Sequence, residues 1–217
     1  IGVLGDIWVV KGVGGHYYSY FGLGQSLALL PLYLLGNWTG MIVGDLGAIS
    51  LEQFFASFLN SVVGALLAMS VFQLGRNLGY RDRTSLGVTL LVSFGTIVWA
   101  HSRDNYDHLL EALWVISVYA MLCYAVAHTS APGYFCAGLL ASAGLITRMS
   151  TACAFPGFAI VLLFGVQGFR PRISDWRWWR HRIREGLLFS AGILPGILFN
   201  LWYNFIRFGD WTMTGYE

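Results

Sequence analysis

Charged residues are scarce in this chain, at 11% of its 217 residues, whereas a typical soluble domain contains roughly 25%. Hydrophobic residues make up 56%. A water-soluble fold of this size has too little interior to bury so much apolar surface. The scarcity of charge therefore excludes an ordinary soluble domain and indicates a protein that lies in a lipid bilayer.

Cysteine is also rare, and its spacing indicates neither a metal site nor a disulfide framework. Cys123, Cys136 and Cys153 all fall inside apolar stretches, so we interpret them as small buried hydrophobic residues. The net charge of +2 gives no indication of nucleic acid, and we expect no nucleic-acid partner. The sequence begins at Ile1 with neither an initiator Met nor a signal peptide, which leads us to expect an internal piece of a longer membrane protein.

The apolar stretches lack the alternation of apolar and polar residues that a membrane β-barrel requires. A membrane-spanning helix needs about 20 apolar residues, within a usual range of about 17–25. Two of the stretches, 86–100 and 134–147, are shorter and would need polar flanking residues to reach the interface. The sequence therefore predicts an all-α, polytopic helical membrane protein with about six transmembrane helices. These are expected at 53–74, 86–100, 109–128, 134–147, 151–168 and 187–205.

Basic residues are unevenly distributed among the connections between these stretches. Nine of the thirteen lie on one side of the predicted membrane, in the connections 75–85, 129–133 and 169–186. The positive-inside rule makes that side cytoplasmic. The segment 175–180, which mixes tryptophan with arginine, is expected to anchor the protein to membrane lipids there. The nine are Arg76, Arg81, Arg83, Arg170, Arg172, Arg177, Arg180, Arg182 and Arg184, and the opposite side has Lys11, Arg103, Arg148 and Arg207.

A further apolar stretch, 21–36, is short for a spanning helix. A helix of that length reaches only about 24 Å, against a hydrocarbon core of about 30 Å. We therefore expect an extracytoplasmic interfacial helix at 21–36. The predicted organisation is a single membrane-embedded unit over 1–217, in which 1–52 form an extracytoplasmic loop, 53–205 hold the transmembrane helices and 206–217 begin another extracytoplasmic segment.

Polar residues on the predicted extracytoplasmic side are densest just before the third of the predicted spans. If the chain is helical there, one face carries Asp104, then Asp107 or His108, and then Glu111. Such an acidic stripe can supply a general base or hold a divalent cation, with Asp104 and Asp107 as the candidate metal ligands. The alternative is an ordinary polar loop in which Asp104 or Asn105 caps the following helix. Glu111 fits that alternative less well, because it lies within an apolar run where a charge is costly.

Arg148 is the most informative single residue. It lies between two predicted helices, on the side that the positive-inside rule depletes of arginine. Its forked donors and permanent charge suit a phosphate group. The alternative is an arginine at a helix end whose side chain extends toward the interface.

Aromatic residues and glycines mark two further segments on the same side, 16–25 and 203–210. Aromatic faces beside glycines suit the stacking of a sugar, but glycines also form turns and aromatic residues also form interfacial belts. The candidate substrate-binding residues in these segments are Tyr17, Tyr18, Gln25, Asn204 and Arg207.

Taken in order, these segments resemble bacterial GT-C glycosyltransferases, the multi-spanning enzymes related to protein O-mannosyltransferases and lipid A aminoarabinose transferases. Segment 17–33 looks like the first extracytoplasmic loop of that family, and 144–151 is similar to its segment with a basic residue between two spans. Segment 203–210, followed by 214–216, is similar to a recurring segment after a later span. The resemblance covers nearly the whole chain.

The resemblance implies an enzyme of the bacterial inner membrane that transfers a sugar from a polyprenyl-phosphate donor on the extracytoplasmic face. Arg148 matches the basic position that would hold the lipid phosphate, and Tyr17 and Tyr18 match the aromatic segment. The family's catalytic carboxylate precedes that segment, where Asp6 is the only acid and lies too close to it, so we expect the true residue upstream of this chain. The weaker candidates for a catalytic carboxylate within the chain are Asp6, Asp104, Asp107 and Glu111.

Two other classes of function stay open on the sequence alone. A transporter or flippase for a lipid-linked saccharide would use helices broken near the middle of the membrane, and Pro156 and Pro195 are candidates for such breaks. Against this class, the sequence shows no internal repeat and its polar residues lie at one face. A membrane scaffold without chemistry would tolerate joint replacement of the extracytoplasmic polar residues.

Overall fold

The computed structural model describes residues 9–19, 21–43, 50–165 and 176–214, and it is 81% helical with 3% strand. The prediction of an all-α protein is therefore confirmed. Within the described residues, four helices are long and apolar enough to cross a membrane. These are Gly24–Val43, Leu51–Asn77, His108–His128 and Trp176–Phe208.

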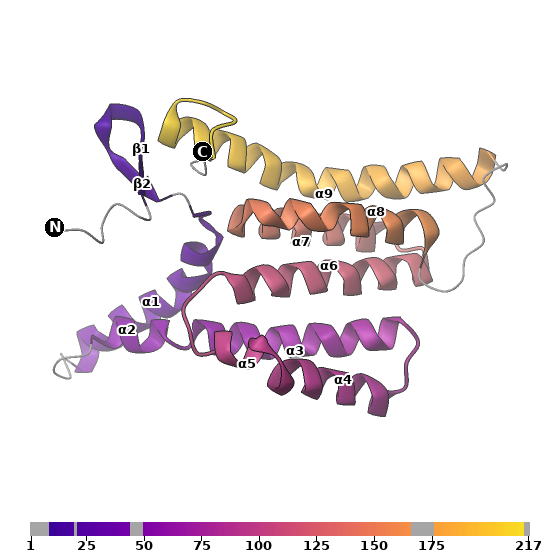
Figure 1. Ribbon diagram of the computed structural model, residues 1–217, viewed down its shortest axis with the longest axis horizontal. Helices are drawn as coiled ribbons and strands as arrows, with labels where there is room; N and C mark the ends of the chain where they lie inside the picture. The colour runs from indigo at the N-terminus through magenta and orange to yellow at the C-terminus, as the bar shows by residue number, and fades with distance from the viewer. Residues whose placement is uncertain (1–8, 20, 44–49, 166–175, 215–217) are drawn as a thin grey trace.

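Helices that lie side by side form the body of the molecule (Figure 1). From one edge to the other, α9 packs on α7, α7 on α6, α6 on α3 and α3 on α4, while α8 contacts α6 and α9. Consecutive helices run in opposite directions, so their connections alternate between two ends. The helices are α3 (Leu59–Asn77), α4 (Asp82–Gly95), α6 (His108–His128), α7 (Ala131–Thr147), α8 (Phe155–Phe164) and α9 (Trp176–Phe208).

Two groups of buried side chains hold these helices together. The larger lies where α6, α7, α8 and α9 meet, and it encloses Leu122, Tyr134 and Phe158. The smaller joins α3 to the start of α6 through residues that include Leu67 and Leu109. Large apolar side chains also cover the outer surface of the bundle. Apolar surface of this extent is typical of a protein that contacts a membrane.

Three of the predicted spans are divided. In 53–74, α2 (Leu51–Ala56) ends and α3 begins at Leu59. In 86–100, α4 ends at Gly95 and the short α5 (Ile97–His101) begins after Thr96, whose hydroxyl accepts a hydrogen bond from the Val98 backbone N–H. In 151–168, a 3₁₀ helix, η2 (Met149–Ala154), precedes α8. By contrast, 109–128 is confirmed as α6. α4, α7 and the pair of η2 and α8 are shorter than the four helices named above, so the number of about six transmembrane helices stays a prediction.

The last predicted span, 187–205, lies within a much longer helix. α9 has 33 residues, which makes it about 50 Å long, more than the ~30 Å hydrocarbon core. Residues 176–186 form its first turns, so their assignment to the connection 169–186 is wrong. Residues 166–175 of that connection, with Arg170 and Arg172, lie outside the described residues.

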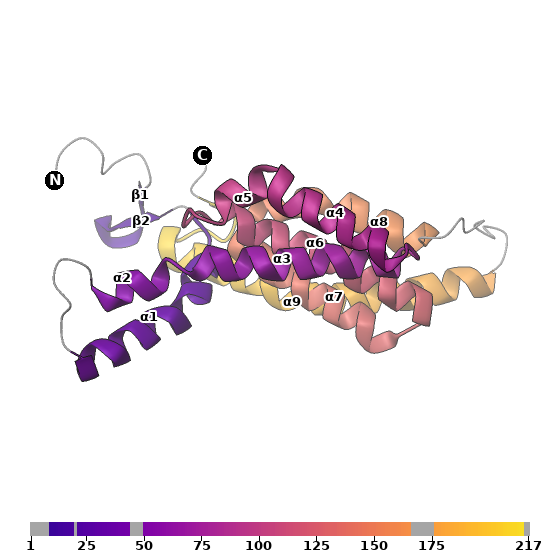
Figure 2. The same ribbon diagram turned by 90° about the horizontal axis from the view of Figure 1, so that it is seen from below.

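The N-terminal helices lie beyond one end of the bundle, as two perpendicular views show (Figures 1 and 2). α1 (Gly24–Val43) packs against the short α2 (Leu51–Ala56) and projects away from the other helices. It is 20 residues long and continues through Pro31, so the bounds expected for this helix, 21–36, are too short. By length and composition α1 could also span a membrane, so its predicted interfacial position is not confirmed.

Before α1 the chain forms a small antiparallel hairpin that the sequence analysis does not predict. Strand β1 (Val9–Lys11) pairs with β2 (Tyr17–Ser19), and the 3₁₀ turn η1 (Val13–Gly15) connects them. The hairpin lies beside the C-terminal end of α9 (Figure 1).

Charged side chains at the end formed by the start of α9 pair with one another. Glu185 is buried; its carboxylate accepts a hydrogen bond from the Tyr134 hydroxyl at 2.5 Å and pairs with Arg182 at 2.6 Å. Arg76 pairs with Asp82 across the connection between α3 and α4. This end also carries the other arginines of α4 and the start of α9, so the described basic residues that the sequence analysis places on one side do lie together.

Neither proline expected to break a helix does so near the middle of the bundle. Pro156 lies in the first turn of α8, where the missing backbone N–H is not required. Pro195 lies inside α9, which continues past it to Phe208. Broken helices of the transporter kind are therefore not found at these two positions.

The cysteines differ in their surroundings. Cys123 is buried, as expected. Cys136 of α7 and Cys153 of η2 are exposed, so their interpretation as buried residues is wrong. An apolar stretch identifies residues that avoid water, and a small side chain satisfies that condition equally well when it faces lipid.

Glycines allow α7 and α9 to approach closely. A Cβ atom on Gly138 of α7 would come within 2.8 Å of the Gly192 Cα, and a Cβ atom on Gly192 within 2.8 Å of the Gly138 Cα. Small residues at the contact between two helices let their backbones pack together in this way. Gly186, earlier in α9, has open space where a Cβ atom would lie.

We expect Gly192→Ala to lower the thermal unfolding temperature, because the backbone of α7 blocks the added methyl group. Overpacking of this kind costs about 1–3 kcal/mol. Gly186→Ala is the matched control, since it adds the same group to the same helix without a clash and alanine is the better helix former by about 1 kcal/mol. Thermal unfolding of both variants in one detergent measures the difference. Equal unfolding temperatures would mean that α7 and α9 do not pack through these glycines.

Candidate functional site

Four segments that are distant in the sequence meet at the end of the bundle next to the start of α1 (Figure 1). The hairpin meets the end of α9, the start of α1 meets the connection from α5 to α6, and that connection meets the one from α7 to η2. These are the segments whose polar residues the sequence analysis places on one side of the membrane. The candidate residues are thus brought to one end by the alternating directions of the helices.

Arg148 is held in place by the end of α7. Its backbone is extended, with φ −151° and ψ 136°, so α7 ends at Thr147 and the guanidinium turns toward α6. There Nη1 donates to Asp107 Oδ1 at 3.1 Å, and Nε lies 3.4 Å from Glu111 Oε2. The Arg148 side chain is only 19% exposed. It therefore fits neither an arginine directed to the interface nor a fully available phosphate site.

Asp107 and Glu111 lie one turn apart at the start of α6. Asp107 occupies the N-cap position, so the expected cap at Asp104 or Asn105 is wrong, and the chain is not helical from residue 104. The side chain of Asp107 is 10% exposed. Glu111 Oε1 accepts hydrogen bonds from the hydroxyls of Ser150 at 2.5 Å and Thr151 at 3.4 Å, in addition to its ion pair with Arg148.

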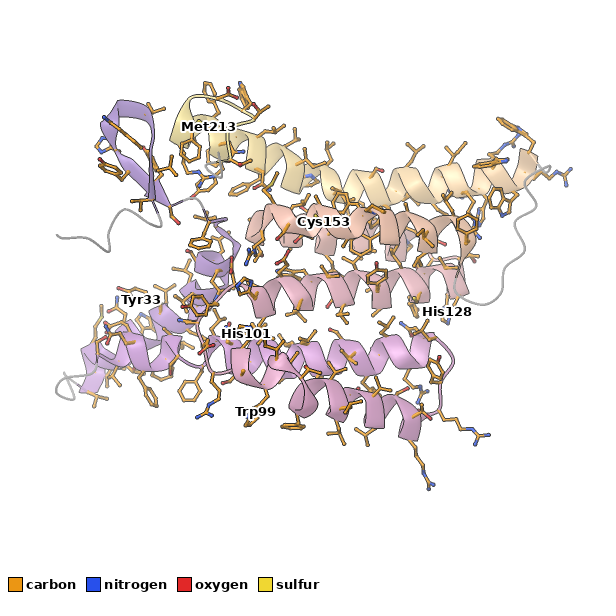
Figure 3. All side chains as sticks on the ribbon, viewed as in Figure 1. Tyr33, Trp99, His101, His128, Cys153 and Met213 are labelled. Carbon is orange, nitrogen blue, oxygen red and sulfur yellow. The ribbon has the colours of Figure 1, made fainter. Side chains whose placement is uncertain are left out.

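Two histidines border this ion pair. Arg148 Nη1 lies 2.5 Å from His108 Nδ1. Because a guanidinium only donates, Nδ1 must accept, which places the imidazole proton of His108 on Nε2. His101 lies next to it, with ring centroids 5.6 Å apart, and its Nδ1 is 3.7 Å from Asp104 Oδ2 (Figure 3).

Asn60 holds the loop that carries Asp107. It is a fully buried residue of α3, and its amide nitrogen donates to the backbone carbonyls of His101 at 3.3 Å, Asp104 at 2.5 Å and Tyr106 at 2.8 Å. A single side chain thus contacts three carbonyls between the end of α5 and the start of α6, and these share the two N–H groups of its amide. Asn60 is a site residue that the sequence analysis misses, although an asparagine inside the apolar run 53–74 is the same kind of signal as Glu111.

A cavity of about 450 Å³ lies between the start of α1, this loop and α9. Asp107 and Gln25 contribute polar groups to its wall, and Phe21, Tyr106 and Tyr203 contribute aromatic rings. Gln25 Nε2 donates to the Asn105 carbonyl at 3.5 Å, which joins α1 to the loop. The cavity therefore brings a carboxylate, an amide and aromatic faces into one space.

α1 can approach the site closely because its first residue is a glycine. A Cβ atom on Gly24 would come within 2.5 Å of the Thr147 Cα. The Thr147 hydroxyl accepts a hydrogen bond from Trp114 Nε1 at 3.0 Å, which ties α7 to α6 at the same level. Any side chain at position 24 would therefore push α1 away from α7 and widen the cavity.

Arg207 connects the hairpin to α9 on the far side of the cavity. The residue is 4% exposed; its Nη1 donates to the Ser19 carbonyl at 2.6 Å and its Nη2 to Asn204 Oδ1 at 2.8 Å. The guanidinium also lies 3.9 Å from the ring centre of Tyr203 and 4.8 Å from that of Phe208. Arg207 and Asn204 thus support the cavity wall, and neither lines the cavity.

The hairpin tyrosines lie outside the cavity. Tyr17 is 66% exposed, and the Tyr18 ring packs edge-on against Phe208 at 6.3 Å between centroids. Of the five candidate substrate-binding residues from the aromatic segments, Gln25 is the one that lines the cavity. Asp6 lies outside the described residues.

Asp210 follows α9 at the same end. Its Oδ1 accepts hydrogen bonds from the backbone N–H and the hydroxyl of Thr212, both at 2.8 Å. These bonds favour the ionised carboxylate and hold the pKa of Asp210 below its ordinary value. Asp210 therefore adds a negative charge to this end.

The two candidate metal ligands do not converge. Asp107 is directed to Arg148, whereas Asp104 is nearest to His101. In the part of the chain that the structure describes, no three histidine, cysteine or acidic side chains are arranged to hold a metal ion. A divalent cation stays a prediction from the sequence.

We expect Asn60→Ala to loosen the connection 101–107, because it leaves partly buried carbonyls there without their donor. Each unsatisfied buried group costs about 1–3 kcal/mol. Asn200→Ala is the control, since the Asn200 amide donates only to Gly196 within the same helix. Hydrogen–deuterium exchange should accelerate across 101–107 in Asn60→Ala alone. Unchanged exchange there would mean that Asn60 does not hold the loop.

Comparison with known proteins provides no relative from which a function can be transferred. No protein-family model, curated protein or solved structure matches the chain. The function has to be inferred from the arrangement of the residues, and the resemblance to GT-C glycosyltransferases stays a prediction.

Proposed function

We propose that this chain is a membrane glycosyltransferase unit that moves a sugar from a polyprenyl-phosphate donor to an acceptor on the extracytoplasmic face. The observation that carries the proposal is the cavity at the polar end of the bundle, which has Asp107 in its wall. A carboxylate, an arginine held against it and aromatic rings are the groups that such a transfer requires. The resemblance of three sequence segments to GT-C enzymes agrees with this reaction class.

Asp107 is the proposed general base. In the transfer, the acceptor hydroxyl attacks the anomeric carbon, the bond from that carbon to the phosphate oxygen breaks, and the hydroxyl proton passes to Asp107. Asp107 lines the cavity, and its carboxylate is held by the hydrogen bond from Arg148. A positioned base of this kind contributes about 10²–10⁴-fold to the rate.

Arg148 is the proposed partner of the departing phosphate. Negative charge develops on that phosphate as the sugar leaves, and a fixed cation in a site that excludes water lowers the barrier. Nη1 and Nε face Asp107 and Glu111, while Nη2 makes no hydrogen bond with a described residue. Nη2 is therefore the donor that we assign to the phosphate, and the two carboxylates fix its direction.

Aromatic rings in the cavity wall are the proposed contacts for the sugar. Tyr106 and Tyr203 border the same cavity as Gln25, whose amide can hydrogen-bond a hydroxyl group. Tyr17 and Tyr18 belong to the adjacent hairpin, and we assign them to the acceptor rather than to the donor.

We further propose that the bundle from α3 to α9 crosses the membrane with its arginine-rich end in the cytoplasm. The positive-inside rule supports this orientation. The position of α1 and α2 beyond the opposite end agrees with a location at the extracytoplasmic interface (Figure 2). The candidate site then opens to the face on which lipid-linked sugars would be used.

We expect Asp107→Asn to reduce sugar transfer at least 100-fold in the full-length protein, because the amide keeps the shape of the side chain but cannot accept the proton. Asp82→Asn is the matched control, since Asp82 is also paired with an arginine but lies at the opposite end. Transfer from a panel of polyprenyl-phosphate sugars in proteoliposomes is the measurement. Full activity of Asp107→Asn would remove it as the base.

The same preparation separates the transferase from a transporter. Folded wild-type protein that transfers no sugar, but takes up lipid-linked saccharide when a proton gradient is imposed, would identify a transporter.

We expect Arg148→Ala to abolish donor turnover while the protein still inserts into the membrane. The loss has two sources, the phosphate contact and the ion pair with Asp107 and Glu111. Glu111→Gln separates them, because it weakens the ion pair but keeps the arginine. Donor binding should be lost in Arg148→Ala and retained in Glu111→Gln. Equal donor binding in wild type and Arg148→Ala would contradict the phosphate role.

A further inference from the structure

A second hollow lies on the outer surface, between α3, α4 and α5, and it is separate from the cavity that Asp107 lines. Its volume is about 620 Å³ and its walls are mainly apolar. On α3 it extends from Ser61 to Ala68, a length of about 10 Å along the helix axis. The dimensions and the apolar lining fit a hydrocarbon chain better than a polar solute.

The floor and one end of this groove are built by close contacts. Gly64 allows α5 to approach α3, because a Cβ atom there would lie 3.3 Å from Ser102 Cβ. The Ser61 hydroxyl donates to the Ser102 carbonyl at 3.2 Å. On α4, the hydroxyl of the buried Thr89 donates within its own helix at 2.8 Å, so it presents little polarity to the groove.

Arg103 lies at the rim of the groove, two residues after α5. It is exposed, and its side chain makes no hydrogen bond or ion pair within the described part of the chain. In this respect it differs from Arg148, which is half-buried, and Arg207, which is buried, since both of these are paired at the same end of the bundle. A cation without a protein partner, next to an apolar groove, is complementary to a lipid with an anionic headgroup.

Aromatic residues place this rim at the depth of the membrane interface. Trp99 packs against Phe94 at 5.3 Å between ring centroids, and both line the groove. Trp99 lies on the outer side of α5, away from α6 (Figure 3). Tryptophan is enriched at the level of the lipid headgroups, and arginine beside it can reach a phosphate.

We propose that the groove between α3, α4 and α5 binds an anionic phospholipid, with one acyl chain in the groove and the phosphate at Arg103. The site does not depend on the proposed transferase activity, because it shares no lining residue with the cavity of Asp107. It would anchor α4 and α5 to the rest of the bundle through a lipid as well as through protein contacts.

Native mass spectrometry of the full-length protein, titrated with dioleoyl phosphatidylglycerol, tests the proposal. We expect Arg103→Ala to reduce lipid retention about fivefold, the effect of removing one basic residue near a membrane surface. Ala65→Phe, which fills the groove from an exposed position on α3, should reduce retention to a similar extent. Arg103→Lys should retain most of the binding because it keeps the charge.

Arg83→Ala is the matched control, since Arg83 is also exposed but lies at the opposite end of α4. It should retain the lipid as wild type does, and equal loss in Arg83→Ala would show a general charge effect and overturn the site. Unchanged retention in Arg103→Ala, or in Ala65→Phe, would overturn it as well. Glycerol 3-phosphate, which has the phosphate without acyl chains, should not displace the lipid; displacement would identify a site for free phosphate instead.

Discussion

Hydrocarbon solvates charge so poorly that the positions of the ionisable groups limit how this chain can fold. In the described residues these groups lie in the outer turns of the helices or in their connections, and those nearest the apolar interior are paired. Arg182 and the Tyr134 hydroxyl hold Glu185 at one end, and Arg148 holds Asp107 and Glu111 at the other. The middle of the bundle stays apolar, so polar chemistry has to take place at an end.

Helix ends also explain why the candidate site forms where it does. Asp107 precedes α6, Arg148 follows α7 and Arg207 lies in the last turn of α9. At such positions the backbone changes direction, and side chains from helices that are distant in sequence can meet. Asn60 then fixes the loop between α5 and α6. The proposed transferase site and the proposed lipid site share this end, but they use different arginines and different cavities.

The sequence predicts the apolar helices better than their ends. α6 agrees closely with the stretch 109–128, because exclusion from water depends on composition alone. By contrast, the sequence does not predict that Thr96 divides a span. It also predicts a connection where the arginine-rich start of α9 is helical. Both features depend on how neighbouring helices pack. In the site, the sequence identifies Asp107 and Arg148 as separate candidate residues. It does not predict the ion pair between them, because that pair requires the packing of α7 on α6.

The central claim is that the end of the bundle with Asp107 faces outward and the arginine-rich end faces the cytoplasm. In a cysteine-free background, Tyr106→Cys and Arg83→Cys place single thiols at exposed positions on the two ends. A membrane-impermeant thiol reagent should label Tyr106→Cys on intact cells and reach Arg83→Cys only after permeabilisation. The reverse pattern would place the candidate site in the cytoplasm, and labelling of both positions from outside would contradict a bundle that crosses the membrane.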